Sequence, residues 1–301
     1  MAEHFKAIHT YSDPGLDKQN IFNHELSIRL HADGLSYCIQ DKQTGRFLHI
    51  EAFDLSDPVR KVYIPGDEEH SGTSRLAELI SGELKWLCQP YAGTRILFEQ
   101  GKSTLVPDAL FAEDSKKTIF DFNVASGRAP EEEIKYDRIT SVNTYNLYRL
   151  PAEMHAFMMK YFPDATIYHH STALITSLIQ KYRNADTANS LFVNTAANHI
   201  DILRIKDKKL EYYNSFRYNT AEDFMYYLVF VVEQLGLNPE SADVILMGEV
   251  EKQSPLVDLI RKYIRNVHYA ERNNDFSYSF VFDQLPGHYY YNLLNASLCG
   301  S

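Results

Sequence analysis

Residues 25–53 read ELSIRLHADGLSYCIQDKQTGRFLHIEAF, and this stretch decides the fold. Alternating apolar residues predict three strands, at Glu25–Leu30, Leu35–Gln40 and Arg46–Phe53. Asp-Gly and Thr-Gly pairs separate the three runs, and glycine accepts the positive φ that tight hairpin turns require. The stretch therefore predicts an antiparallel meander of three strands.

The second half of the chain repeats this order of elements. A second meander is predicted at Ser190–Asn194, His199–Ile205 and Leu210–Phe216. Apolar residues at helical spacing predict helices at Ser74–Gln89, Ala152–Tyr161, Thr172–Arg183, Thr220–Gly236 and Pro255–Ile264. Further strands are expected at Thr94–Glu99, around Asp137–Tyr148, at Thr166–His170 and at Asp243–Met247. Three strands, a helix and a strand thus occur twice, which indicates an internal duplication of a ββαβ-type unit.

The polar stretch Asn184–Asn189 lacks apolar periodicity, so we place the domain boundary there. The expected division is an N-terminal extension at 1–20, a first domain at 21–185 and a second domain at 186–301. The second domain includes an aromatic-rich C-terminal segment, in which the alternation at Phe276–Phe282 predicts a strand. We expect this segment to pack on its own domain, with a protein interface as the alternative. The apolar run Met225–Val232 predicts a helix buried on all sides.

Charge and hydropathy exclude several classes of partner. Thirty Lys and Arg residues against forty Asp and Glu residues give a net charge of −10, the wrong sign for gripping nucleic acid or an anionic lipid surface. No apolar run is long enough to cross a bilayer, and the first residues lack a signal-peptide pattern. We therefore expect a cytoplasmic protein with no membrane insertion and no nucleic-acid partner.

The duplicated meander followed by helices resembles the ribonuclease H-like layout of the actin-like ATPase superfamily. Three motifs carry the resemblance: Ile28–Asp33, Asn194–Asp201 and Val244–Glu249 stand where that superfamily has its two phosphate loops and its adenosine loop. The sequence looks most like an uncharacterised bacterial family, a domain of unknown function, with distant similarity to actin-like proteins of cell division and type IV pilus assembly. The resemblance covers roughly residues 20 to 285 and implies an α/β fold of two actin-like domains, each with a mixed sheet flanked by helices.

The motifs depart from the family pattern at the residues that handle nucleotide. Arg29 stands where the resemblance implies a metal-orienting carboxylate, and Asn194 replaces the other carboxylate. His31 and Ala196 replace glycines, and a side chain there obstructs the approach of backbone N–H groups to phosphate. The degenerate phosphate-loop and adenosine positions are Arg29, His31, Asp33, Asn194, Ala196, His199, Asp201, Gly248 and Glu249. We therefore expect no bound cofactor and slow or absent hydrolysis, and we assign no catalytic residue and no metal ligand.

Three functional hypotheses follow from these motifs. The first is a catalytically inactive scaffold or interaction module that binds an unidentified protein or a second copy of itself. The second is an ATP-dependent conformational switch in which Asp33, Asp201 and Gly248, with the histidines, replace the missing groups. The third is a metal-assisted hydrolase built on His31, Asp33, His199 and Asp201. The pair His169-His170 is expected to point to opposite faces of a strand, so that one metal ion would not take both.

Overall fold

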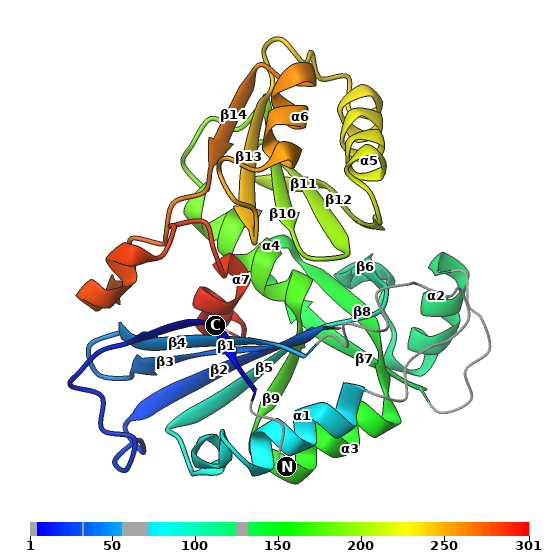
Figure 1. Cartoon of the computed structure of the whole chain (residues 1–301). Helices are drawn as coiled ribbons and strands as arrows, with labels where there is room; N and C mark the ends of the chain where they lie inside the picture. Colours follow the sequence, from blue (N-terminus) through cyan, green and yellow to red (C-terminus); the bar gives the residue numbers. More distant parts are fainter. Residues whose placement is uncertain (1–4, 32, 56–71, 125–131, 301) are drawn as a thin grey trace.

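The computed structural model describes residues 5–31, 33–55, 72–124 and 132–300, which form two lobes with a helix between them (Figure 1). The first lobe contains a sheet in the order β1-β4-β3-β2-β5-β9, and the short strand β15 pairs with β4 at its side. The strands are β1 (Ala7–Ser12), β2 (His24–His31), β3 (Gly34–Asp41), β4 (Arg46–Asp54), β5 (Gly93–Glu99), β9 (Thr166–His169) and β15 (Ser277–Tyr278). The predicted first meander is confirmed as β2, β3 and β4.

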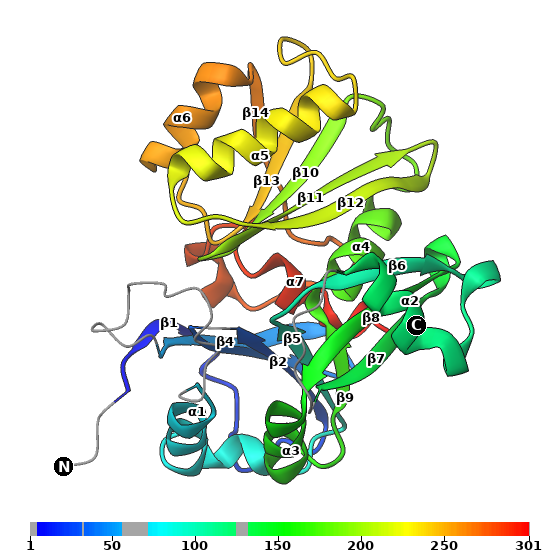
Figure 2. The ribbon, with the colours of Figure 1, turned by 90° about the vertical axis from the view of Figure 1, so that its right-hand side faces the viewer.

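Two helices, α1 (Gly72–Ser81) and α3 (Ala152–Tyr161), cover the face of this sheet that is turned away from the second lobe (Figure 2). Leu79 and Ile80 of α1 and Met158 of α3 are fully buried and belong to the same core cluster as the sheet residues. The helix expected at Ser74–Gln89 is shorter: α1 ends at Ser81, and a 3-10 turn at Lys85–Cys88 follows.

A small third sheet stands beside the first lobe, in the order β6-β8-β7. Its strands are β6 (Ser103–Pro107), β7 (Glu132–Ile139) and β8 (Thr144–Pro151), and helix α2 (Lys116–Asn123) packs on it through the buried Phe120. The turn Gly101–Ser103 leads from β5 into this sheet, with Gly101 at φ 79°.

The second lobe is a five-stranded sheet in the order β12-β11-β10-β13-β14. Its elements are β10 (Ser190–Thr195), β11 (His199–Lys206), β12 (Lys209–Arg217), α5 (Ala221–Gln234), β13 (Asp243–Gly248), α6 (Pro255–Tyr263) and β14 (Asn266–Tyr269). Helix α5 begins with a complete capping box, in which Thr220 and Asp223 satisfy each other's backbone N–H groups. The two helices cover the outer face of this sheet (Figure 2).

The two lobes share one strand plan. The first lobe has an antiparallel meander, β4-β3-β2, followed in the sheet by two parallel strands, β5 and β9. The second lobe has an antiparallel meander, β12-β11-β10, followed by the parallel strands β13 and β14. This correspondence confirms the duplicated unit and the α/β fold class.

Helix α4 (His170–Lys181) lies between the lobes (Figures 1 and 2). Every residue from His170 to Ile179 is buried, so neither face of the helix meets solvent there. The helix starts two residues earlier than its apolar pattern predicts, because the side chain of His169 accepts a hydrogen bond from the Ser171 N–H and caps it.

The C-terminal aromatic segment packs on both lobes. Only Ser277–Tyr278 of the strand expected at Phe276–Phe282 is extended, and a 3-10 helix follows at Phe280–Gln284. Strand β15 pairs with β4, and Phe282 belongs to the same core cluster as Phe47 of the first lobe. Tyr291 belongs to a cluster with Phe192 of the second lobe, so the segment packs on the domain to which the sequence assigned it and on the first lobe as well. The remaining short elements are helix α7 (Tyr291–Leu294) and the 3-10 turns Asp108–Leu110, Glu113–Ser115, Thr140–Val142 and Ala296–Leu298.

Helix α5 is not buried on all sides, so that expectation is wrong. Leu228 and Val232 are fully buried, but Tyr226 is 65% exposed and Phe230 is 41% exposed. The helix forms the outermost layer of its lobe, so only one of its faces has a sheet to pack against. No helix in the described part of the chain is long and apolar enough to span a membrane.

Candidate functional site between the lobes

The two hairpins that resemble phosphate loops face each other between the lobes. The turn between β2 and β3 contributes from the first lobe, and the turn between β10 and β11 contributes from the second. They enclose a cavity of about 10 Å³, which is close to the space that one water molecule needs. The lining residues are Arg29, His31, Asp33, Glu99, Ala196, Ala197, Asn198, His199 and Glu249.

Arg29 joins the two lobes across this cavity. It is only 4% exposed, and its Nε atom lies 3.5 Å from Oε2 of Glu99, at the end of the neighbouring strand β5. Its Nη2 atom donates a hydrogen bond to Oε1 of Glu249, which follows β13 in the second lobe. The guanidinium thus neutralises two carboxylates, one from each lobe.

The charges in this cluster depend on one another. Burial would raise the pKa of Glu99, but Arg29, with smaller contributions from His170, His199 and His31, lowers it to about 2. Burial and then the charge of Arg29 lower the pKa of His31, which favours the neutral imidazole at pH 7. The cavity is therefore lined by a compensated ion-pair network.

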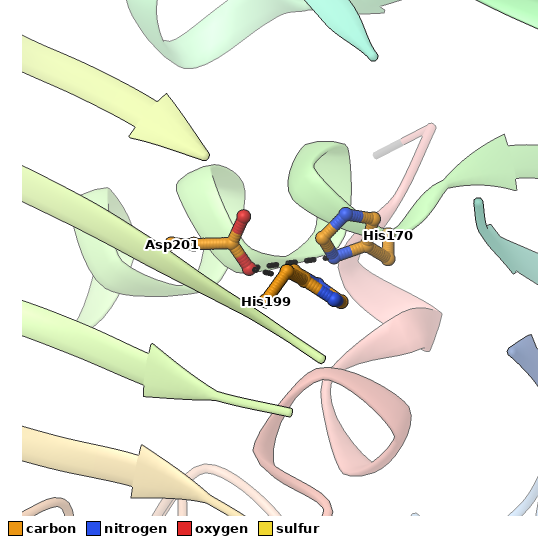
Figure 3. A group of neighbouring side chains, drawn as sticks. All are labelled: His170, His199 and Asp201. Carbon is orange, nitrogen blue, oxygen red and sulfur yellow. Dashed lines mark ion pairs between the residues drawn. The ribbon is translucent and has the colours of Figure 1, made fainter. Parts of the chain in front are cut away.

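A second group lies beside the cavity, where β11 meets the start of α4. Figure 3 shows His170, His199 and Asp201 converging. Oδ2 of Asp201 lies 3.6 Å from Nδ1 of His170 and 3.7 Å from Nε2 of His199. Asp201 is fully buried and accepts hydrogen bonds from Nδ2 of Asn194 at 2.9 Å and from the Tyr213 hydroxyl at 3.1 Å. Ligand atoms of His170, His199 and Asp201 all lie within 4.8 Å of one another, whereas His31 and Asp33 do not join any such group in the described structure.

Gly248 has a packing role. Its φ of 87° lies in the region that favours glycine, and a Cβ there would stand 2.2 Å from the Thr195 carbonyl oxygen. The next residue, Glu249, donates its N–H to the same oxygen at 2.9 Å. The close approach of β13 to β10 therefore accounts for a glycine at this position, and no bound ligand is needed to explain it.

The expectation that the two adjacent histidines point to opposite faces of a strand is wrong: His170 is the first residue of helix α4, and the two ring centroids lie 4.5 Å apart. Their hydrogen-bonding and ionic partners nevertheless differ. The backbone N–H of His169 donates to Oδ2 of Asp137, and Thr172 donates to the same oxygen. Burial raises the pKa of Asp137 to about 7, although Thr172, His169 and Tyr148 lower it by hydrogen bonding. His170 turns instead toward Asp201.

A larger groove of about 560 Å³ lies between the tip of the three-stranded sheet and strand β12, and Tyr213, which donates to Asp201, lines it. Asn143, Lys208 and Tyr212 are among its lining residues, and none of the nine predicted site positions is.

The structure brings the nine predicted positions together, and three further residues join them. Arg29, His31, Asp33, Ala196, His199 and Glu249 line one cavity, and Asn194, Asp201 and Gly248 lie directly behind it. Glu99, His170 and Tyr213 were not predicted. The sequence could have indicated Glu99, because a carboxylate directly follows the apolar run Ile96–Phe98. No local sequence pattern indicates that Tyr213 belongs to the site.

Comparison with known proteins gives a family and a fold. A family model described as "Protein of unknown function (DUF3822)" matches residues 13–267, and no curated protein sequence matches the chain. A solved structure from Bacteroides thetaiotaomicron VPI-5482, described as a protein with actin-like ATPase fold and unknown function, is 23% identical, with a TM-score of 0.73, and the match covers 89% of this chain and 97% of that one. A chain of the PilM-PilN type IV pilus biogenesis complex is 12% identical, with a TM-score of 0.58 and coverage of 91% and 97%. Structural similarity at 23% and 12% identity shows the fold alone, and this fold is that of the actin-like ATPases.

Proposed function

The chain belongs to the family described as protein of unknown function (DUF3822), and from its own site we propose that it is an actin-like protein that neither binds nor hydrolyses nucleotide. In this proposal it acts as a scaffold or protein-interaction module. The observation that carries the proposal is the ion-pair network of Arg29 with Glu99 and Glu249, at the place where the resemblance expects phosphate and metal.

The size of the cavity supports this proposal. It has a volume of about 10 Å³, whereas sites for small molecules and cofactors have volumes of roughly 300–1,000 Å³. A nucleotide would enter only if the lobes separated. Separation would break the contact between Arg29 and Glu249 and expose a guanidinium that is now 4% exposed.

The charges of the cavity also disfavour phosphate. Glu99 and Glu249 both point into it, and the pKa of about 2 keeps Glu99 ionised at neutral pH. Arg29, which would be the natural phosphate ligand, is already shared by these two carboxylates. Binding of a polyphosphate would therefore require giving up a buried ion pair and bringing like charges together.

An exposed aromatic pair supports a role in protein contacts. Tyr226 and Phe230 stack on the outer face of α5, with ring centroids 6.3 Å apart and an angle of 17° between the planes. Aromatic side chains supply large contact area at low entropic cost, and they are enriched at interfaces. The neighbour with a TM-score of 0.58 is described as part of a complex with another protein, which is in keeping with this role. The partner, or self-association, and the cytoplasmic location are parts of the same proposal.

Calorimetric titration with Mg-ATP and Mg-ADP tests the nucleotide part. We expect no heat of binding up to millimolar nucleotide. Micromolar binding that is lost in Asp201→Ala would overturn the proposal and favour the ATP-dependent switch, in which nucleotide competes with the Arg29 contacts.

A further inference from the structure

We propose that His170, His199 and Asp201 bind one divalent transition-metal ion of the Zn²⁺ class, which ties the start of α4 to strand β11. The site shares His199 and Asp201 with the predicted phosphate-loop positions, but metal uptake is measured without nucleotide, so the proposal stands or falls separately from the proposed function. The sequence treated His170 as part of a strand end and expected no metal ligand.

The distances suit an ion better than direct hydrogen bonds. The two nitrogens lie 3.6 and 3.7 Å from Oδ2 of Asp201, beyond the usual hydrogen-bond range of about 2.7–3.2 Å. Ligands that each lie about 2.0–2.2 Å from a zinc ion stand roughly 3.4 Å apart in tetrahedral geometry. The two N···O spacings lie within a few tenths of an ångström of this value, and the ligand atoms of all three residues lie within 4.8 Å of one another.

Neither nitrogen makes a hydrogen bond to a described residue, although Oε1 of Glu99 lies 3.9 Å from Nε2 of His199. His170 Nδ1 and His199 Nε2 are buried and have no hydrogen-bond partner in the described structure. Buried polar atoms are nearly always paired, so two such nitrogens aimed at one carboxylate oxygen indicate a missing ligand. His170 is only 3% exposed, so solvent does not supply that ligand freely.

The surrounding groups prepare the ligands. Nδ1 of His199 lies 3.1 Å from Oδ1 of Asn198, an acceptor, so Nδ1 carries the proton and Nε2 presents its lone pair. The Tyr213 hydroxyl and Asn194 amide orient the Asp201 carboxylate, as outer partners do in metal sites.

The buried carboxyl group of Asp201 also favours a bound cation. Asp201 is fully buried, and no Lys or Arg among the described residues lies within ion-pair distance of it. An ionised buried carboxylate is costly unless a cation accompanies it. Two imidazoles and one carboxylate suit zinc and its neighbours among the divalent transition metals. The adjoining cavity, lined by His199 and Glu99, offers room for a water molecule as a fourth ligand.

Metal uptake by the untagged protein tests this site. After treatment with a chelator and its removal, we expect one Zn²⁺ per chain by calorimetry and elemental analysis. We expect His170→Gln and His199→Gln to weaken binding by at least about 100-fold, since losing even an outer partner costs roughly 10- to 100-fold.

The matched control is His268→Gln. His268 also lies close to an aspartate, with Nε2 3.2 Å from Oδ1 of Asp243, but this pair is exposed and has no third ligand among the residues that the structure describes. Binding should survive this change. Absence of stoichiometric Zn²⁺ binding by wild type, or full binding in both His170→Gln and His199→Gln, would overturn the proposal.

X-ray absorption on the zinc-loaded wild type provides a test that does not depend on how the variants fold. We expect a low-coordinate shell of nitrogen and oxygen with the scattering signature of two imidazoles. A shell of oxygen alone would place the ion elsewhere and refute the assignment.

Discussion

Replacement of Arg29 by methionine should destabilise the protein, mainly because it leaves the buried carboxylate of Glu99 without its counter-charge. The side chain of Glu99 is 2% exposed, so without the guanidinium its charge has neither solvent nor a full counter-charge. Removing one partner of a buried ion pair costs about 3–5 kcal/mol, and we expect a loss of this size in Arg29→Met at pH 7.

The pH dependence provides an independent estimate. The pKa of Glu99 falls from its ordinary value of 4.5 to about 2 in the folded protein. This difference corresponds to about 3 kcal/mol of stability at neutral pH, since one pK unit is about 1.4 kcal/mol. Because the folded pKa is depressed, this stability is fully present above pH 4.5 and is lost as the pH falls toward 2. In Arg29→Met, burial of Glu99 should dominate, and acidification should no longer cost this stability.

Urea unfolding from pH 3 to pH 7, followed by circular dichroism in the presence of a chelator, measures both effects. The double variant Arg29→Met with Glu99→Gln should recover part of the loss, because it removes both buried charges. The control is Glu249→Gln, which should cost less because the Glu249 side chain is 28% exposed. A loss below about 1 kcal/mol in Arg29→Met, the level of an exposed salt bridge, would refute this reasoning, as would an unchanged pH profile.

Two further predictions concern neighbouring residues. Asp137→Asn should flatten the pH dependence of the free energy of unfolding. In wild type, burial raises the pKa of Asp137 from 3.8 to about 7, so the folded form binds this proton more tightly than the unfolded form does. Wild-type stability therefore falls as the pH rises through that interval, and the asparagine variant lacks this effect. Urea titrations at several pH values detect this change, and an identical slope in both proteins would contradict it. Gly248→Ala should cost at least about 2 kcal/mol in urea unfolding, because it combines left-handed strain with a clash against the Thr195 carbonyl. Its control is Gly236→Ala, where φ is also positive at 62° but no atom lies within 4 Å of the added Cβ; equal losses in the two variants would exclude the clash.

The sequence predicted the parts of the fold whose signals are local. Asp33-Gly34 and Thr44-Gly45 marked the hairpin turns, and alternation marked the strands, because turn chemistry and a two-residue period act over short distances. The same pattern recurring after residue 190 revealed the duplication. Edge strands β1, β6 and β14 were not predicted, since short strands carry little periodicity.

Errors arose where distant segments decide the outcome. The alternation of aromatic residues at Phe276–Phe282 indicated a strand. In the structure the rings of Phe47 and Tyr278 stack with their centroids 5.3 Å apart, and the chain continues as a 3-10 helix from Phe280. Tyr226 and Phe230 counted as apolar in the helical pattern, and only the position of α5 as an outer layer leaves them exposed. His170 reaches Asp201 through tertiary structure, which no spacing in the sequence encodes.

A crystal structure of the wild-type protein grown with Mg²⁺ and a non-hydrolysable ATP analogue at millimolar concentration would show whether the cavity between the lobes takes nucleotide. We expect that Arg29 still contacts Glu99 and Glu249 and that no nucleotide lies between the two hairpins. A nucleotide bound there, with the contact between Arg29 and Glu249 broken, would contradict this expectation.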